Sequence, residues 1–231
     1  YRDFYFGSNV HLMMADFRSF RPDHLIPEEA FPGHIALDKN ACIAVFTGLA
    51  GGNAAAGLAL YDGAKASFKP YFDFNVAPWS DYSPVIGAVL TAYYISKGAA
   101  PADASALATT LSTAKINAEI AKSLVDQYNA TPGIPTPAPA IDPAVFPTLD
   151  RGVDFSLMGK SGVFGELGSR YFVVKPTYDM YAAYRAAVTA GAAQNAYGTA
   201  QTSWLQSTLA SSTARWKFLG SSVSMTSLVL D

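Results

Sequence analysis

Three charged side chains follow directly after the first clearly apolar segment of the chain. The run Val10–Ala15 is short and mostly apolar, a pattern typical of a buried strand, and Asp16, Arg18 and Arg21 come immediately after it. In open α/β sheets, ligands bind beyond the carboxyl ends of the strands. Guanidinium groups bind phosphate and other oxyanions through paired hydrogen bonds. The spacing therefore predicts an oxyanion site at this strand end, and an ion pair that pins the strand to the next loop is the alternative interpretation.

A second motif comes close to a phosphate-binding P-loop. Gly159-Lys160-Ser161 matches the end of the motif, but its first glycine is replaced by Asp154, whose negative charge would repel a phosphate. A nucleophile elbow needs Gly-x-Ser-x-Gly, and the glycine at 162 follows the serine one position too early. The sequence therefore predicts neither a nucleotide site nor a nucleophilic serine here.

The three histidines do not have the spacing of a metal centre. His11 lies in the middle of the first strand, where we expect a buried core residue, and His24 and His34 lie on or beside a proline-rich loop, where we expect exposure to solvent. No metal site is predicted from the residues of this chain.

Composition narrows the class of protein. Half of the 231 residues are hydrophobic, which fits one domain, or one domain that carries an insertion. The formal net charge is -2 and the basic residues are scattered, so we expect no nucleic-acid-binding surface. The single cysteine, Cys42, excludes an internal disulfide framework, and no basic segment followed by an apolar one marks a signal peptide.

One uncharged stretch is long enough to cross a bilayer. Residues 41–61 carry no charge, but they are rich in Gly and Ala and contain Gly51-Gly52-Asn53. These residue types contribute little to membrane insertion. We therefore expect small-residue helices or loops packed in a globular core, and no membrane span.

The remaining elements are expected from hydrophobic periodicity and from helix-capping residues. They are a helix from Ser83-Pro84 to Gly98, one long helix over 103–128, a proline-rich connector at 131–147, a glycine-rich loop at 152–168, a strand at 171–174, a helix at 177–188, a helix capped by Thr199, and one strand, or two short ones, over 216–230.

This order of elements predicts an α/β fold with a large, mostly helical insertion. We expect catalytic-domain elements at 1–21 and 191–231, and a helical and loop insertion or cap at 22–190. Because a strand lies close to each end, both ends are expected to fall inside a domain.

Two segments together resemble the alkaline phosphatase D family of metallophosphoesterases. The first is 9–21, an apolar strand ending in Asp16-x-Arg18-x-x-Arg21. The second is 197–219, similar to the family's Leu-Gly-x-x-Gln-x-x-Trp-Leu helix and the tryptophan-containing strand that follows it; here Gln201 and Trp204 match. The resemblance covers the two ends of the chain and leaves its long middle unassigned.

The resemblance implies hydrolysis of phosphate mono- or diesters in a four-layer α/β/β/α sandwich. It also implies calcium and iron, or related divalent ions, that activate a water and neutralise charge on the transferring phosphoryl group. The family's metal ligands would lie outside this chain, in the remainder of the same polypeptide. Only three residues carry over: Asp16, with an orienting role, and Arg18, as a phosphate or transition-state contact, are the implied catalytic residues. Arg21 is implied as a further phosphate contact. A periplasmic or secreted location is also implied.

A second function class stays open beside this one. The aromatic segment Tyr71–Trp79 and the tyrosine-rich helices could belong to a non-catalytic binding or surface-interaction module. Aromatic clusters more often build a core than a binding surface, which favours the phosphoesterase hypothesis.

Overall fold

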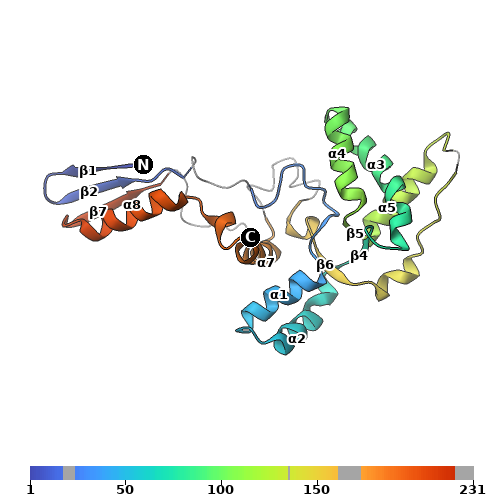
Figure 1. The fold of residues 1–231 in the computed structure, drawn as a ribbon, viewed down its shortest axis with the longest axis horizontal. Coiled ribbons are helices and arrows are strands. Elements are labelled where there is room, and N and C mark those ends of the chain that lie inside the picture. The colour runs from blue at the N-terminus through green and yellow to red at the C-terminus, as the bar shows by residue number, and fades with distance from the viewer. Residues whose placement is uncertain (18–23, 135, 161–172, 222–231) are drawn as a thin grey trace. The chain divides into compact units, whose positions relative to one another are not determined.

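The structure is a computed structural model that describes residues 1–17, 24–134, 136–160 and 173–221 (Figure 1). The chain divides into two compact units: unit 1 contains residues 1–25 and 185–231, and unit 2 contains residues 26–184. The insertion expected at 22–190 starts four residues before unit 2 and ends six residues after it. Helices and strands occur in both units, which confirms the coarse prediction of a mixed α/β protein.

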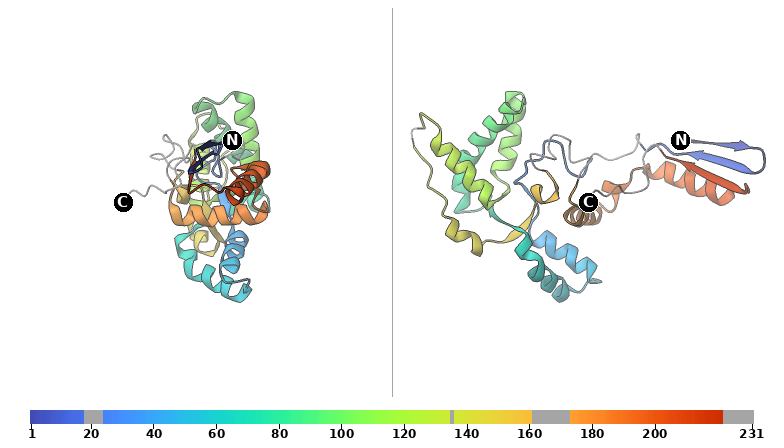
Figure 2. Two further views of the ribbon diagram at one scale, coloured as in Figure 1. Left: turned by 90° about the vertical axis from the view of Figure 1, so that its left-hand side faces the viewer. Right: turned by 180° about the vertical axis from the view of Figure 1, so that it is seen from behind.

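Unit 1 contains a three-stranded sheet with one helix on one of its faces. Its elements are β1 (Arg2–Phe6), β2 (Val10–Met14), β7 (Trp216–Gly220) and α8 (Gly198–Ser211). The strand order is β1-β2-β7, in which β1 is antiparallel to β2, and β7 is parallel to it. Helix α8 lies along the strands in both Figure 1 and Figure 2. Its contacts with His11 and Asp16 place it on the face where His11 and Met13 are buried.

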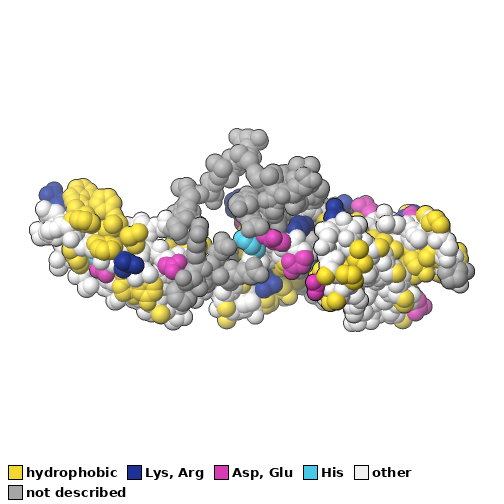
Figure 3. Space-filling model, turned by 90° about the horizontal axis from the view of Figure 1, so that it is seen from above, with side chains coloured by type: hydrophobic (Ala, Val, Ile, Leu, Met, Phe, Trp, Pro, Cys, Tyr) yellow, Lys and Arg dark blue, Asp and Glu magenta, His cyan; other side chains and the backbone are white. Residues whose placement is uncertain are grey.

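The opposite face of this sheet is apolar, and no helix or strand of the described residues covers it. Cross-strand register places the side chains of seven apolar residues on it: Phe4, Phe6, Val10, Leu12, Met14, Trp216 and Phe218. We call this set the open face. Phe6 is 60% exposed, Trp216 58% and Phe218 53%. In Figure 3, hydrophobic side chains gather over unit 1 at the left of the view.

Unit 2 is built around a four-stranded antiparallel sheet in the order β3-β6-β4-β5. Its strands are β3 (Ile35–Leu37), β4 (Lys69–Asp73), β5 (Lys115–Asn117) and β6 (Arg151–Asp154). Its α-helices are α1 (Lys39–Leu49), α2 (Ala54–Ala64), α3 (Ser83–Ser96), α4 (Pro101–Ser112) and α5 (Ala118–Ala130), with most of α7 (Lys175–Val188). Short 3-10 turns connect them at Lys65–Ser67, Trp79–Tyr82, Pro143–Thr148 and Ser156–Met158.

The aromatic segment at 71–79 forms the core of unit 2. Phe72 and Phe74 are fully buried, and the ring of Phe72 lies 4.2 Å from that of Trp79. Residues from α3, α4 and α5, such as Ile86 and Val125, complete the cluster. The buried aromatic side chains of this segment are therefore used for packing.

The uncharged stretch at 41–61 forms two packed helices, as expected from its small residues. Asp38 accepts a hydrogen bond from the backbone N–H of Ala41 at the start of α1, and Asn53 caps α2 in the same way. A side chain at Gly57 would lie 2.2 Å from Oγ1 of Thr47, so the glycine allows the two helices to approach closely. No helix among the described residues combines the length and apolarity of a membrane span.

The prediction of one long helix over 103–128 is wrong. The chain forms α4, then β5, then α5, because residues 115–117 pair with β4 and because Asn117 accepts a hydrogen bond from the N–H of Glu119 to start a new helix. The strand contains only three residues, so the helical periodicity on both sides of it hides the interruption.

Other boundaries also differ from the sequence prediction. The expected loop at 152–168 begins with strand β6, so unit 2 contains a sheet as well as helices, and 161–172 lie outside the described residues. Of the strand expected at 171–174, only Val173 and Val174 are described, and they are not in a strand. Thr199 lies inside α8, whose first N–H, that of Gly198, donates to the side chain of Asn195.

Candidate functional site

Asp16 lies at the carboxyl end of β2, where a buried glutamine holds its backbone. The N–H of Asp16 donates to Oε1 of Gln201 over 2.6 Å, and Nε2 of Gln201 donates to the carbonyl oxygen of Asp16 over 2.7 Å. Gln201 has no exposed surface, and its Nε2 also donates to the carbonyl oxygen of Tyr197. Arg18 and Arg21, the predicted phosphate contacts, lie outside the described residues.

The two segments that carry the family resemblance therefore meet at one place. Strand β2 runs parallel to β7, and the N–H of Ala15 extends this pairing by donating to Gly220. Phe17 packs edge-on against the ring of Tyr197, directly before the first turn of α8. The carboxyl end of the strand and the amino end of the helix are adjacent, an arrangement that is used for anion binding in α/β proteins.

His11 is a buried core residue, as predicted. Its Nδ1 lies 2.9 Å from Oγ of Ser212, and its Nε2 lies 2.8 Å from Oδ2 of Asp3. A chain of Ser, His and Asp also occurs in nucleophilic enzymes, but there the imidazole must reach the substrate. Here His11 has no exposed surface and stacks against Tyr5 at 3.9 Å. These hydrogen bonds satisfy a buried polar ring and join β1, β2 and the end of α8.

The P-loop interpretation fails in the structure as it does in the sequence. Lys160 folds back on the chain, and its Nζ donates to the carbonyl oxygens of Pro27 and Glu28. Burial lowers the pKa of Lys160. Asp154 is fully buried and accepts hydrogen bonds from Asn117, Ser156 and the N–H of Leu157. Both charged side chains therefore serve the local fold.

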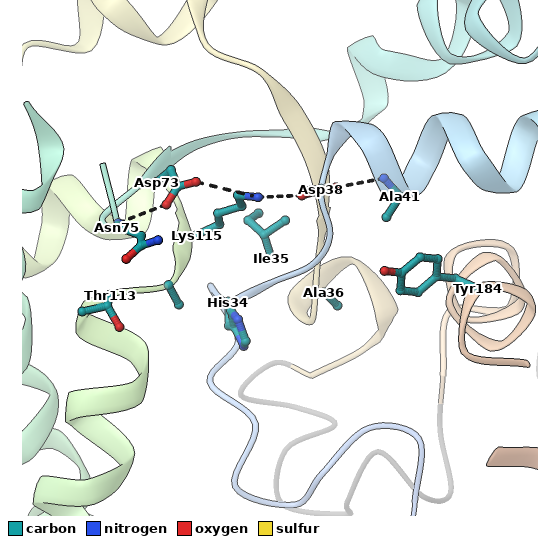
Figure 4. Close-up of a pocket in the computed structure, with 11 residues that line it drawn as sticks. His34, Ile35, Ala36, Asp38, Ala41, Asp73, Asn75, Thr113, Lys115 and Tyr184 are labelled. Carbon is teal, nitrogen blue, oxygen red and sulfur yellow. Dashed lines mark hydrogen bonds and ion pairs between the residues drawn. The ribbon is translucent and has the colours of Figure 1, made fainter. Parts of the chain in front are cut away.

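A pocket of about 340 Å³ lies in unit 2, where the ends of β3, β4 and β5 meet α1 and α7 (Figure 4). Lys115 lies between two carboxylates: its Nζ is 2.6 Å from Oδ2 of Asp38 and 3.7 Å from Oδ2 of Asp73. Asn75, Thr113, His34 and Tyr184 complete the polar lining. All of these residues belong to unit 2.

The charges of this pocket are set by burial and by the central lysine. Burial opposes ionisation of Asp38, but the hydrogen bonds from Lys115 and Ala41, with the charge of Lys115, outweigh it and lower the pKa of Asp38. Burial lowers the pKa of His34 below 6.5, so the imidazole is neutral at pH 7. At neutral pH the pocket therefore holds two negative charges and one positive charge.

Neither location gathers the ligands of a metal centre. Within the described residues, three or more Cys, His, Asp or Glu side chains do not come together in a group that could hold an ion. The resemblance places the family's metal ligands outside this chain, so the described residues do not fit calcium or iron as they stand.

Sequence reasoning missed the pocket and the role of Gln201. The pocket residues come from segments between 34 and 184, and no short motif contains them. One local pattern does point to a structural role for Asp38. An aspartate directly before a run of helix-forming residues is a typical helix cap. In the sequence, Gln201 stands out only as part of a motif. Its role could not be predicted because its contact with Asp16 spans 185 positions.

Comparison with known proteins gave no match: no protein family, no curated protein and no solved structure is similar to this chain at a significant level.

Proposed function

We propose that this chain is an internal segment of an exported, metal-dependent hydrolase of phosphate mono- or diesters. The observation that carries the proposal is the pairing of Gln201 with Asp16, which joins the two segments that resemble the alkaline phosphatase D family. The contact spans 185 positions and brings together the two segments that the resemblance assigns to one catalytic domain.

The open face gives independent support. Parallel pairing is typical of sheets that are covered on both faces, and β2 pairs in parallel with β7 in this mixed sheet. Helix α8 covers one face, whereas the large apolar side chains of the open face remain exposed. A second sheet packed on this face would complete the α/β/β/α order of layers that the resemblance implies. The remainder of the same polypeptide would supply that sheet.

Within this proposal, the residues of the chain have defined tasks. Gln201 fixes the backbone at Asp16, two residues before Arg18 in the sequence, and the proposed contacts with the phosphate ester are Arg18 and Arg21. A guanidinium group pairs with two phosphate oxygens and stabilises the charge that develops on them during transfer. Metals bound by the remainder of the polypeptide would supply the activated water.

The test uses the complete reading frame that encodes this chain. Hydrolysis of p-nitrophenyl phosphate and bis-p-nitrophenyl phosphate is measured with added Ca²⁺ and iron, in the parent protein and in R18A. We expect activity in the parent protein and a loss of about 100-fold or more in kcat for R18A, the size typical of a lost transition-state contact. R215A, which removes an exposed arginine outside this site, is the matched control and should keep its activity.

Two results would contradict the proposal. One is a folded full-length protein that binds no metal and hydrolyses neither ester. The other is an equal loss of activity in R18A and R215A, which would remove the specific role of Arg18.

A further inference from the structure

The pocket of unit 2 has hydrogen-bonding groups for which the described residues provide no partner. Oδ1 of Asp73 accepts the N–H of Asn75, whereas its Oδ2 lies 3.7 Å from Lys115, beyond hydrogen-bonding distance. The ammonium group of Lys115 has three N–H donors, and one of them reaches Asp38. A carboxylate oxygen and ammonium protons therefore remain available to a ligand.

Neutral polar groups surround this charged centre. Figure 4 shows Asn75 beside Asp73, and Tyr184 entering from α7 with its phenol oxygen directed toward the pocket. Across the described part of the chain, the side chains of Asn75, Tyr184 and His34 make no hydrogen bond. Each of them can donate one and accept one. The lining is thus a mixture of donors and acceptors around a volume at the lower end of the range for small-molecule pockets.

The charges exclude some classes of ligand. Two carboxylates against one ammonium give the pocket a net negative charge, which repels phosphate and carboxylate groups. A simple cation would have to compete with Lys115, whose ammonium group already occupies the position between the two carboxylates. A hydroxyl group avoids both difficulties, because it donates to a carboxylate and accepts from an ammonium or amide group. The rings of Tyr184 and His34 offer apolar surface for the carbon atoms between the hydroxyls.

We propose that this pocket binds a neutral polyhydroxylated molecule of monosaccharide size, held by Asp73, Lys115, Asn75 and Tyr184. The inference does not depend on the phosphoesterase proposal, since every lining residue lies in unit 2.

Isothermal titration calorimetry on the 231-residue chain tests this site. The probes are glucose, mannose, galactose and myo-inositol, each to about 50 mM, a range that detects millimolar dissociation constants. N75A and Y184F each remove one group that no described residue uses. The matched controls are N40A, on the exposed side of α1, and Y178F, two turns earlier on α7. Circular dichroism confirms that every variant is folded.

The expected result is saturable binding of at least one probe, weakened about fivefold in N75A and Y184F, as for one lost hydrogen bond. The two controls should match the parent chain. The proposal is overturned if no probe binds, if the pocket variants bind as tightly as the controls, or if inorganic phosphate or ethanolamine binds and the four polyols do not.

Discussion

The side chain of Gln201 makes two hydrogen bonds with the backbone of Asp16: it accepts from the N–H over 2.6 Å and donates to the carbonyl oxygen over 2.7 Å. One side chain thus satisfies two backbone groups that β-sheet pairing leaves without partners at the end of the strand. The contact fixes the backbone of Asp16 directly after the end of β2.

The first prediction concerns this contact. Q201A removes the hydrogen bonds that Gln201 makes with the N–H and the carbonyl oxygen of Asp16. We expect a loss of about 2–6 kcal/mol in the stability of unit 1, since each of the two backbone groups costs about 1–3 kcal/mol when its hydrogen bond is lost. Hydrogen exchange of the amides in β2 and α8 measures the effect. Q206A, on the exposed side of the same helix, is the control and should exchange like the parent chain. Equal protection in both variants would show that the contact contributes nothing.

The second prediction concerns the open face. Exposed apolar side chains bind the dye ANS and promote association, so F218T should reduce ANS fluorescence and concentration-dependent association of the 231-residue chain. Threonine preserves strand propensity at this position. L58T, which replaces an exposed leucine of α2 in unit 2, is the control and should change both signals less. An unchanged ANS signal in F218T would mean that the face is already covered in solution.

The third prediction compares two glycines of the same helix. In G57A the new methyl group would meet the side chain and backbone of Thr47, whereas nothing lies within 4 Å of the corresponding position at Gly63. We expect G57A to lower the free energy of unfolding by about 1–3 kcal/mol through overpacking. G63A should raise it by about 0.5–1 kcal/mol, because alanine loses less backbone entropy in a helix than glycine. Urea denaturation followed by circular dichroism distinguishes the two, and equal effects would contradict the close packing of α1 and α2.

The fourth prediction is the pH dependence of the Asp38–Lys115 ion pair. The folded state lowers the pKa of Asp38, so the pair stabilises the fold above the pKa of an unfolded aspartate, about 3.9, and this contribution is lost as the pH falls through the folded value. D38N keeps a helix-capping oxygen but removes the charge. We expect D38N to be less stable than the parent chain by about 1 kcal/mol at pH 7.

The difference between D38N and the parent chain should disappear at low pH, where Asp38 is protonated in both the folded and the unfolded states. Urea titrations from pH 7 down to pH 2.5 measure it. D150N is the control, because it breaks the Lys39–Asp150 ion pair, which is more exposed than the Asp38–Lys115 pair. Its loss of stability relative to the parent chain at pH 7 should be smaller than that of D38N. A D38N deficit that stays constant with pH would mean that the charge of Asp38 is not its source.

The sequence predicts the elements whose signals are local. The strand at 10–14, the helix starting at Ser83-Pro84 and its end before Gly98, where φ is 94°, all follow from short patterns of apolar, proline and glycine residues. The partner of β2 could be suggested only by the paired resemblance of the two segments.

Features that depend on distant contacts could not be predicted in this way. The three residues of β5 have no strand signal of their own and become a strand because β4 lies beside them. The same is true of the pocket, in which Asp38, Asp73 and Lys115 meet although no motif links them. Hydrophobic periodicity describes which side of an element is buried, and it does not say which elements meet.

The parallel pairing of β2 with β7 has a consequence for biosynthesis. Unit 2 is continuous in sequence and can fold as soon as it leaves the ribosome, whereas the first strands of unit 1 must wait until β7 has been translated. During that interval the hairpin of β1 and β2 exposes apolar residues on both faces, because α8 has also not yet been made. The interval during which nascent chains can aggregate is therefore set by the length of unit 2, and slower translation of this unit would extend it.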